Sequence, residues 1–149
     1  MADLRSLAHR HSRRKGQAVV EFALILPVFM LLLLGAVEFG RAYLRLHILT
    51  NASREGARAG SLPGSTTADV TSTVGNFLSS AGIAPATCSV TVVVTDKFGT
   101  VRAGGLTAAQ QGDRVYVNIT HNFEVLTGTM IPGFSGIVPL HATCVFAHE

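Results

Sequence analysis

Three residues near the N-terminus, Gly16, Gln17 and Glu21, have the types and spacing for a proteolytic step followed by a charge pairing. Glu21 is the single charged residue in a stretch that is otherwise uncharged from Gly16 to Val37. A charge inside a membrane helix costs roughly 2.5 to 3.5 kcal/mol on insertion scales, so the carboxylate needs a partner. Cleavage after Gly16 would give Gln17 a positively charged α-amine. Because residues four apart share a helix face, we predict that Glu21 pairs with this amine, within its own chain or on a neighbour.

Other reactive chemistry finds little support in the sequence. The six histidines have no spacing typical of a zinc site, and there is no Cys-x-x-Cys pair. There is also no glycine-rich phosphate loop opening a helix and no Gly-x-Ser-x-Gly elbow. We therefore expect neither an enzyme nor a resident metal or cofactor.

The charge of the chain is concentrated at its N-terminal end. The chain has 149 residues and a formal net charge of +3, but residues 1–16 alone carry five basic residues against Asp3, or +4, which leaves −1 for the rest. No aromatic residue is interleaved among these basic residues, so nucleic-acid binding is not expected. Basic residues next to a membrane helix are retained in the cytoplasm, which predicts a cytoplasmic N-terminus and a C-terminal domain outside.

The apolar stretch is a short membrane span. Phe22 to Val37 covers about 24 Å as a helix, against about 30 Å of hydrocarbon, whereas Gln17 to Val37 covers about 32 Å. Pro27 lies inside it and either kinks the helix or is tolerated, as proline often is in membrane helices. One alternative is a secretory signal peptide cut after this segment, which would release a soluble domain.

A single long helix is predicted to position these groups, from about Gln17 to Ala59, with the membrane-embedded part ending near residue 37. Beyond that point the pattern becomes amphipathic, with charged residues on the opposite side. Gly60 and Pro63 give the usual order of a helix stop. The predicted apolar face of the outer half comprises Phe39, Ala42, Tyr43, Leu46 and Leu49.

These segments together resemble a known family. The relevant runs are Gly16-Gln17-Ala18-Val19-Val20-Glu21-Phe22, Leu26-Pro27, Glu38-Phe39-Gly40-Arg41 and Asn51-Ala52-Ser53-Arg54-Glu55-Gly56-Ala57-Arg58. The chain resembles the TadE-like pseudopilins, minor pilins of Tad (tight adherence) pili, which are related to type IV pili. The resemblance implies removal of a leader, residues 1–16, by a prepilin peptidase and a role in assembling or initiating an adhesive filament. The partners it implies are that peptidase, the major pilin, other minor pseudopilins and the inner-membrane assembly platform.

The remaining residues, 61–149, are predicted to form a small extracytoplasmic α+β domain. A helix is expected from about Thr67 to Ser80, capped by Thr66 or Thr67 and closed by Gly82. Three segments with strand character predict a small antiparallel sheet. Residues 96–112 contain four glycines and no strong periodicity, which suggests a mobile loop. The predicted strands are Cys88–Thr95, Arg114–Phe123 and Val138–Phe146.

Two further groups of residues carry specific hypotheses. The only two cysteines, Cys88 and Cys144, both fall in the outer domain, so we expect a disulfide, with two free thiols as the alternative. Arg54, Glu55 and Arg58 form the densest charge group after the leader. They are either a solvated helix end or a subunit contact, and the family resemblance favours the contact.

Two functions from different classes follow. The first is a processed minor pilin of the inner membrane that enters a filament or primes its assembly. The second is a permanently membrane-anchored extracytoplasmic binding module. Glu21 distinguishes them, because a plain anchor gains nothing from a carboxylate in its apolar segment.

Overall fold

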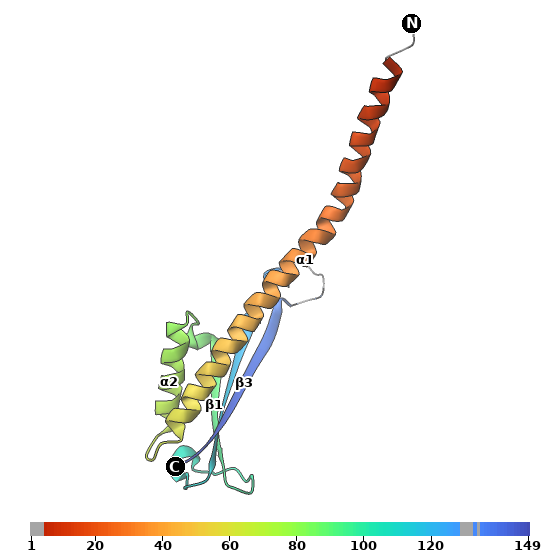
Figure 1. Ribbon diagram of the computed structural model, residues 1–149. Coiled ribbons are helices and arrows are strands. Elements are labelled where there is room, and N and C mark those ends of the chain that lie inside the picture. Colours follow the sequence, from red (N-terminus) through yellow and green to blue (C-terminus); the bar gives the residue numbers. More distant parts are fainter. Residues whose placement is uncertain (1–4, 129–132, 134) are drawn as a thin grey trace. The chain divides into compact units, whose positions relative to one another are not determined.

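The computed structural model describes residues 5–128, 133 and 135–149. The described residues form two α-helices, a three-stranded sheet and short 3-10 helices, which confirms the predicted α+β class (Figure 1). Contacts divide it into an N-terminal unit that ends at Phe39 and a second unit from Gly40 to Glu149. The elements are α1 (Arg5–Gly60), α2 (Thr67–Ser80), η1 (Pro85–Thr87), β1 (Cys88–Thr95), η2 (Gly105–Ala108), β2 (Arg114–Glu124) and β3 (Ile137–Ala147).

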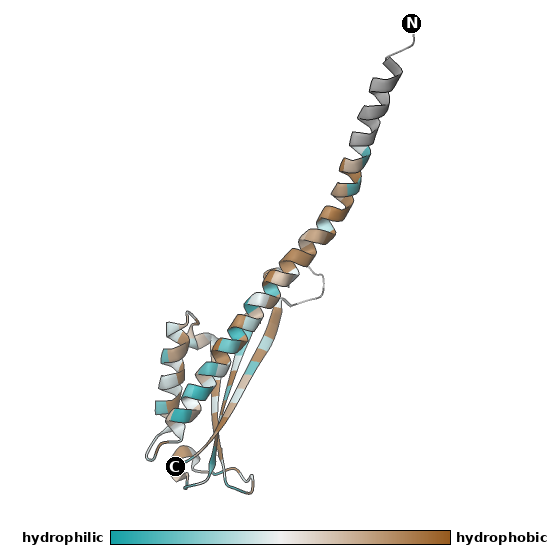
Figure 2. Ribbon diagram, viewed as in Figure 1, coloured by the Kyte–Doolittle hydropathy of each residue, from teal (hydrophilic) through white to brown (hydrophobic). Residues whose placement is uncertain are grey.

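The N-terminal unit consists of the first part of α1, which continues through Pro27. The helix begins at Arg5 rather than near Gln17, so the predicted start was wrong by about three turns. The reason is that leucine, alanine, arginine and lysine, which occur in this region, are all good helix formers. From Val19 to Val37 the helix is mostly hydrophobic (Figure 2). Its large apolar side chains are almost all exposed. By length and composition this helix is a candidate membrane span, as predicted.

The second unit contains an antiparallel sheet with the strand order β1-β2-β3. Within β2 every second side chain from Val115 to Phe123 is buried, which is the alternation expected when one face of a sheet is covered. The predicted strand positions are confirmed, with β2 one residue longer and β3 one residue longer at each end. The buried core includes Leu49, Ala52, Ala57, Val70, Val74, Leu78, Ile83, Val94, Leu106, Val115, Val117, Ile119 and Ala142.

Glycine allows α1, α2 and β2 to pack closely together. A Cβ atom added at Gly56 would lie 2.5 Å from Cγ2 of Val74 in α2 and 3.4 Å from Cγ1 of Val117 in β2. A Cβ atom at Gly60 would meet Val70 at 3.0 Å and Val115 at 3.1 Å. The outer part of α1 therefore packs against both α2 and the sheet through small residues.

The face of α1 that packs into the core differs from the predicted one. Leu49 is fully buried as expected, but Tyr43 is 64% exposed and Leu46 36% exposed. The buried face contains small residues because close packing against β2 excludes large side chains. Its small buried members are Ala52, Ser53, Gly56, Ala57 and Gly60.

Helix α2 has well-formed ends that explain why its bounds could be predicted. The Thr66 side chain accepts a hydrogen bond from the Asp69 backbone N–H, and the Asp69 carboxylate accepts one from the Thr66 backbone N–H. At the other end Gly82 has φ +73, and the backbone N–H of Ile83 donates to the carbonyl of Leu78 at 2.9 Å. This left-handed glycine closes the helix, as predicted.

The predicted disulfide is contradicted by the sheet register. Both cysteines are free. Cys88 in β1 pairs with His121 of β2. Cys144 in β3 pairs with Val117, which comes four residues before His121 in β2. This offset is about 13 Å along the strands and about 10 Å across them, far beyond the reach of a disulfide.

Candidate functional site

The predicted cleavage and pairing residues lie on one face of α1 in the N-terminal unit. The side-chain amide of Gln17 donates to Oε1 of Glu21 at 3.3 Å, so the two positions are within reach of each other. Both side chains are exposed, and no atom outside the helix approaches the Gly16 position within 4 Å. The side chain of residue 17 therefore reaches the Glu21 carboxylate, as expected for residues four apart on a helix, while the pairing with a new α-amine stays a prediction.

The charge group near the end of α1 forms an ion pair on the surface. Arg58 donates from Nη2 to Oε1 of Glu55 at 2.5 Å and from Nε to Oε2 at 3.2 Å. This hydrogen bonding lowers the pKa of Glu55 below its usual value. Arg54 is exposed and lines a shallow groove with Tyr43 and His47. Exposed pairs of this kind add little stability, so the subunit contact stays a prediction.

The loop between β1 and β2 is held by a second ion pair. Arg102 donates from Nε to Oδ2 of Asp113 at 2.7 Å and from Nη2 to Oδ1 at 3.0 Å. The Asp113 side chain is 5% exposed, and Oδ2 also accepts the backbone N–H of Gln110 at 2.8 Å. Leu106 of η2 lies in the core. The loop predicted to be mobile therefore has specific contacts at both ends and an apolar anchor.

The C-terminus is joined to this ion pair and to the end of α1. The backbone N–H of His148 donates to the Asp113 carbonyl at 2.7 Å, and Nδ1 of His148 donates to the Gly60 carbonyl at 3.2 Å. The backbone N–H of Glu149 donates to the Ser61 carbonyl at 2.9 Å. These bonds close the end of the outer domain.

Acid is expected to destabilise the outer domain through Asp113. The hydrogen bonds from Arg102, then that from the Gln110 backbone, hold the pKa of Asp113 below its usual value. A carboxyl group with a lowered folded-state pKa stabilises the fold fully above its unfolded pKa of about 3.9, and this contribution disappears as the pH falls through the folded-state pKa. We expect Asp113→Asn to lower the urea midpoint at pH 7 and to reduce its fall between pH 5 and pH 2.5. Glu124→Gln, at an exposed acid of β2, is the matched control; equal changes in both variants would contradict this role of Asp113.

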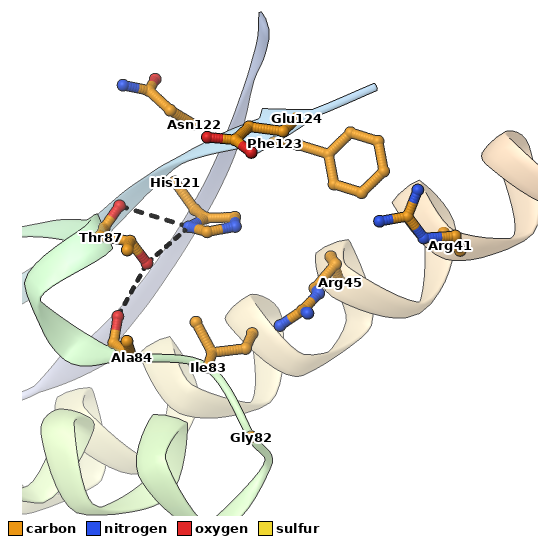
Figure 3. A pocket seen from close by; sticks show the side chains of 10 residues that line it. All are labelled: Arg41, Arg45, Gly82, Ile83, Ala84, Thr87, His121, Asn122, Phe123 and Glu124. Carbon is orange, nitrogen blue, oxygen red and sulfur yellow. Dashed lines mark hydrogen bonds between the residues drawn. The ribbon is translucent and has the colours of Figure 1, made fainter. Parts of the chain in front are cut away.

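A pocket of about 290 Å³ lies beside the end of β2, entirely within the second unit (Figure 3). Arg41 and Arg45 reach it from successive turns of α1, and His121 and Phe123 enter it from β2. The Arg41 guanidinium lies over the Phe123 ring, 5.2 Å from its centroid, at a cation–π distance. The remaining lining residues are Gly82, Ile83, Ala84, Thr87, Asn122 and Glu124.

The His121 ring is fixed by the chain that precedes β1. Its Nδ1 donates to the Thr87 carbonyl at 3.3 Å and also lies 3.3 Å from the Thr87 hydroxyl and 3.5 Å from Sγ of Cys88. Burial raises the pKa of the Cys88 thiol, which opposes formation of a reactive thiolate. This cluster therefore serves to orient His121 rather than to supply a nucleophile.

The sequence did not identify this pocket as a site. The charged residues after Val37, which include Arg41 and Arg45, were expected opposite the apolar face of the helix, whereas the structure places Arg45 one turn before the buried Leu49. The missed signal was a pair of arginines at i,i+4 shortly after the apolar stretch, at the end opposite the basic residues 5–15. His121 gave no local signal, because its neighbours come from β1 and α1. In the part of the chain that the structure describes, no group of histidine, cysteine or acidic residues could hold a metal ion.

Comparison with known proteins gives one finding. A family model described as TadE-like protein matches residues 16–58. No curated protein and no solved structure matches the chain significantly. The matched segment covers α1 from the predicted cleavage position to the Arg58–Glu55 ion pair, so the comparison bears on this helix and leaves the sheet and α2 without a counterpart.

Proposed function

We propose, on the premise that residues 16–58 make this chain a TadE-like protein, that it is a minor pilin that takes part in assembling or initiating a Tad-type adhesive pilus. A prepilin peptidase would remove residues 1–16, leaving Gln17 as the first residue of a long apolar helix. The role is structural, with no catalytic step of its own. The mature chain would sit in the inner membrane with its N-terminal end toward the cytoplasm and residues 61–149 outside.

The observation that carries this proposal is the carboxylate of Glu21 within an exposed apolar helix. Around it the large side chains of α1, from Val19 to Val37, are predominantly exposed and apolar. A hydrogen bond from the side-chain amide of residue 17 reaches this carboxylate at 3.3 Å. After cleavage the α-amine of residue 17 would supply a positive charge to the same region, which offsets part of the cost of a carboxylate among lipid tails.

The proposal names four partners. They are the prepilin peptidase, the major pilin, other minor pseudopilins and the inner-membrane assembly platform. The exposed end of α1, with Arg54 and the Glu55–Arg58 pair, is the surface we assign to a neighbouring subunit. A permanently membrane-anchored binding module is the alternative, and it requires neither cleavage nor Glu21.

Processing provides the first test. We expect the membrane-derived protein to begin at Gln17 in cells that have their prepilin peptidase and at its unprocessed N-terminus in cells that lack it, by intact mass and N-terminal sequencing. Gly16→Leu should leave at least ten times more uncut chain than wild type, because a bulky side chain occupies the position before the scissile bond. Gly35→Leu, at another open glycine of α1, is the matched control and should be processed normally. An uncut wild-type chain in both strains would favour the anchored module, and a start beyond Val37 would indicate a secreted domain.

A further inference from the structure

The pocket beside the end of β2 combines positive charge with an apolar wall. Two of its lining side chains are arginines and one is an acid, Glu124, at the rim. Arg45 projects into the hollow beside Ile83, while Arg41 lies against the Phe123 ring. Guanidinium groups present several N–H donors in a fixed plane and favour phosphate and carboxylate oxygens.

His121 adds a third polar group with a fixed orientation. Because Nδ1 is engaged by Thr87, the other ring nitrogen, Nε2, faces the pocket (Figure 3). This nitrogen points toward the part of the pocket that is lined by Arg41, Arg45 and Ile83. The pocket therefore offers a guanidinium donor to a small oxyanion, an imidazole acceptor to a hydroxyl beside that oxyanion, and the Phe123 ring to an attached apolar group.

The position of the pocket in the chain restricts where its ligand lies. Arg41 follows Val37, the last residue of the uncharged stretch, by four residues, so however the two units are arranged their Cα atoms are at most about 14 Å apart. Lipid headgroups occupy a layer several Å thick directly outside the hydrocarbon. Arginine side chains near the end of a membrane helix extend toward that layer. A lipid phosphate is thus the oxyanion nearest to this pocket in a membrane-anchored chain.

We infer that the pocket formed by Arg45, Arg41, His121 and Phe123 binds the phosphate of an anionic phospholipid headgroup in the outer leaflet of the anchoring membrane. The inference rests on the membrane anchorage proposed above but on no step of pilus assembly. Phosphate oxygens would accept hydrogen bonds from Arg45, a headgroup hydroxyl would donate to Nε2 of His121, and the glycerol would lie against Phe123. Such a contact explains why two arginines follow the apolar segment on the side that ordinarily carries few of them.

The test uses the full chain purified in a neutral detergent, with lipid binding followed by native mass spectrometry during titration with phosphatidylglycerol or phosphatidylcholine. We expect wild type to bind phosphatidylglycerol more tightly, and Arg45→Gln to weaken this binding by about tenfold, the range for a charge-assisted hydrogen bond. Arg45→Lys should fall between them, because it keeps the charge and loses the planar fork. Arg54→Gln removes an equal charge from the same helix outside the pocket and should bind like wild type.

Two further measurements make the result decisive. Glu124→Gln removes the acid from the rim, so it should bind phosphatidylglycerol more tightly than wild type, a gain that misfolding cannot produce. Inorganic phosphate is titrated in parallel to separate a headgroup from a free anion. Equal weakening in Arg45→Gln and Arg54→Gln, no preference for phosphatidylglycerol, or Arg45-dependent binding of inorganic phosphate alone would each overturn the inference. Flotation with phosphatidylcholine liposomes tests membrane anchorage separately. Neither the lipid-binding result nor the flotation result depends on cleavage of the chain or on filament assembly.

Discussion

Replacement of Glu21 by alanine is expected to abolish filament assembly while leaving the protein processed and membrane-bound. The variant removes a carboxylate that costs roughly 2.5 to 3.5 kcal/mol in an apolar helix, so insertion should be as good as wild type or better. The variant lacks the carboxylate that would pair with the α-amine of Gln17, either on the same processed chain or on a neighbouring one. We expect filaments recovered by shearing to fall to the level of a deletion strain, measured against the amount of this protein in the membrane.

The specificity of that result depends on two comparisons. Glu21→Gln keeps the size and hydrogen-bonding capacity of the side chain and removes its charge, so an equal loss of filaments would show that the charge is needed. Glu124→Gln makes the same change at an exposed acid of β2, outside the apolar segment and outside the proposed subunit contact, and should form normal filaments. Normal filaments from Glu21→Ala at a normal protein level would contradict the proposed pairing and favour the anchored module. Failure of the lipid experiment would leave this prediction untouched.

Local patterns predicted most of the elements of this fold correctly. The bounds of α2 follow from Thr66, Asp69 and Gly82, which act through neighbouring backbone groups and are visible in the sequence. The strands follow from alternating burial, which depends only on whether one face is covered. The reach of Gln17 to Glu21 could be predicted for the same reason, since the two are neighbours on a single helix; cleavage and charge pairing there stay predictions.

Features that depend on packing between distant segments of the chain could not be predicted from local sequence patterns. The buried face of α1 is made of small residues, whose hydrophobicity is low but whose size lets the helix approach β2; a ranking by hydrophobicity instead selected Tyr43 and Leu46. The disulfide hypothesis was wrong because Cys88 and Cys144 lie in the same sheet but far apart along it. That distance depends on the register of the strands, which local sequence patterns do not predict. The basic pocket requires α1 and β2 to meet, a contact between residues about 80 positions apart that no local pattern encodes.

Gly56→Ala is expected to destabilise the outer domain, although alanine is the better helix former. The added Cβ would lie 2.5 Å from Cγ2 of Val74, a side chain that is fully buried and branched at Cβ, and 3.4 Å from Val117. Overpacking of this kind costs typically about 1 to 3 kcal/mol, and the gain in helix propensity offsets about 1 kcal/mol of it. We therefore expect a net loss of up to about 2 kcal/mol in the free energy of unfolding, and a larger loss for Gly56→Val, measured by urea denaturation in detergent.

The same substitution at Gly75 of α2 should change stability in the opposite direction. A Cβ atom there meets only Pro85, at 3.9 Å, which is an ordinary contact, so Gly75→Ala should gain up to about 1 kcal/mol. Two glycine-to-alanine changes of opposite sign would show that Gly56 is required for its size rather than for its backbone freedom. Gly56 lies near the end of the segment, residues 16–58, that resembles TadE-like proteins. Such a result would give this helix a second task besides the proposed anchoring, because α2 and the sheet pack closely against it. A stabilising effect of Gly56→Ala would contradict the close approach of α1 to Val74 and remove the packing argument for that face.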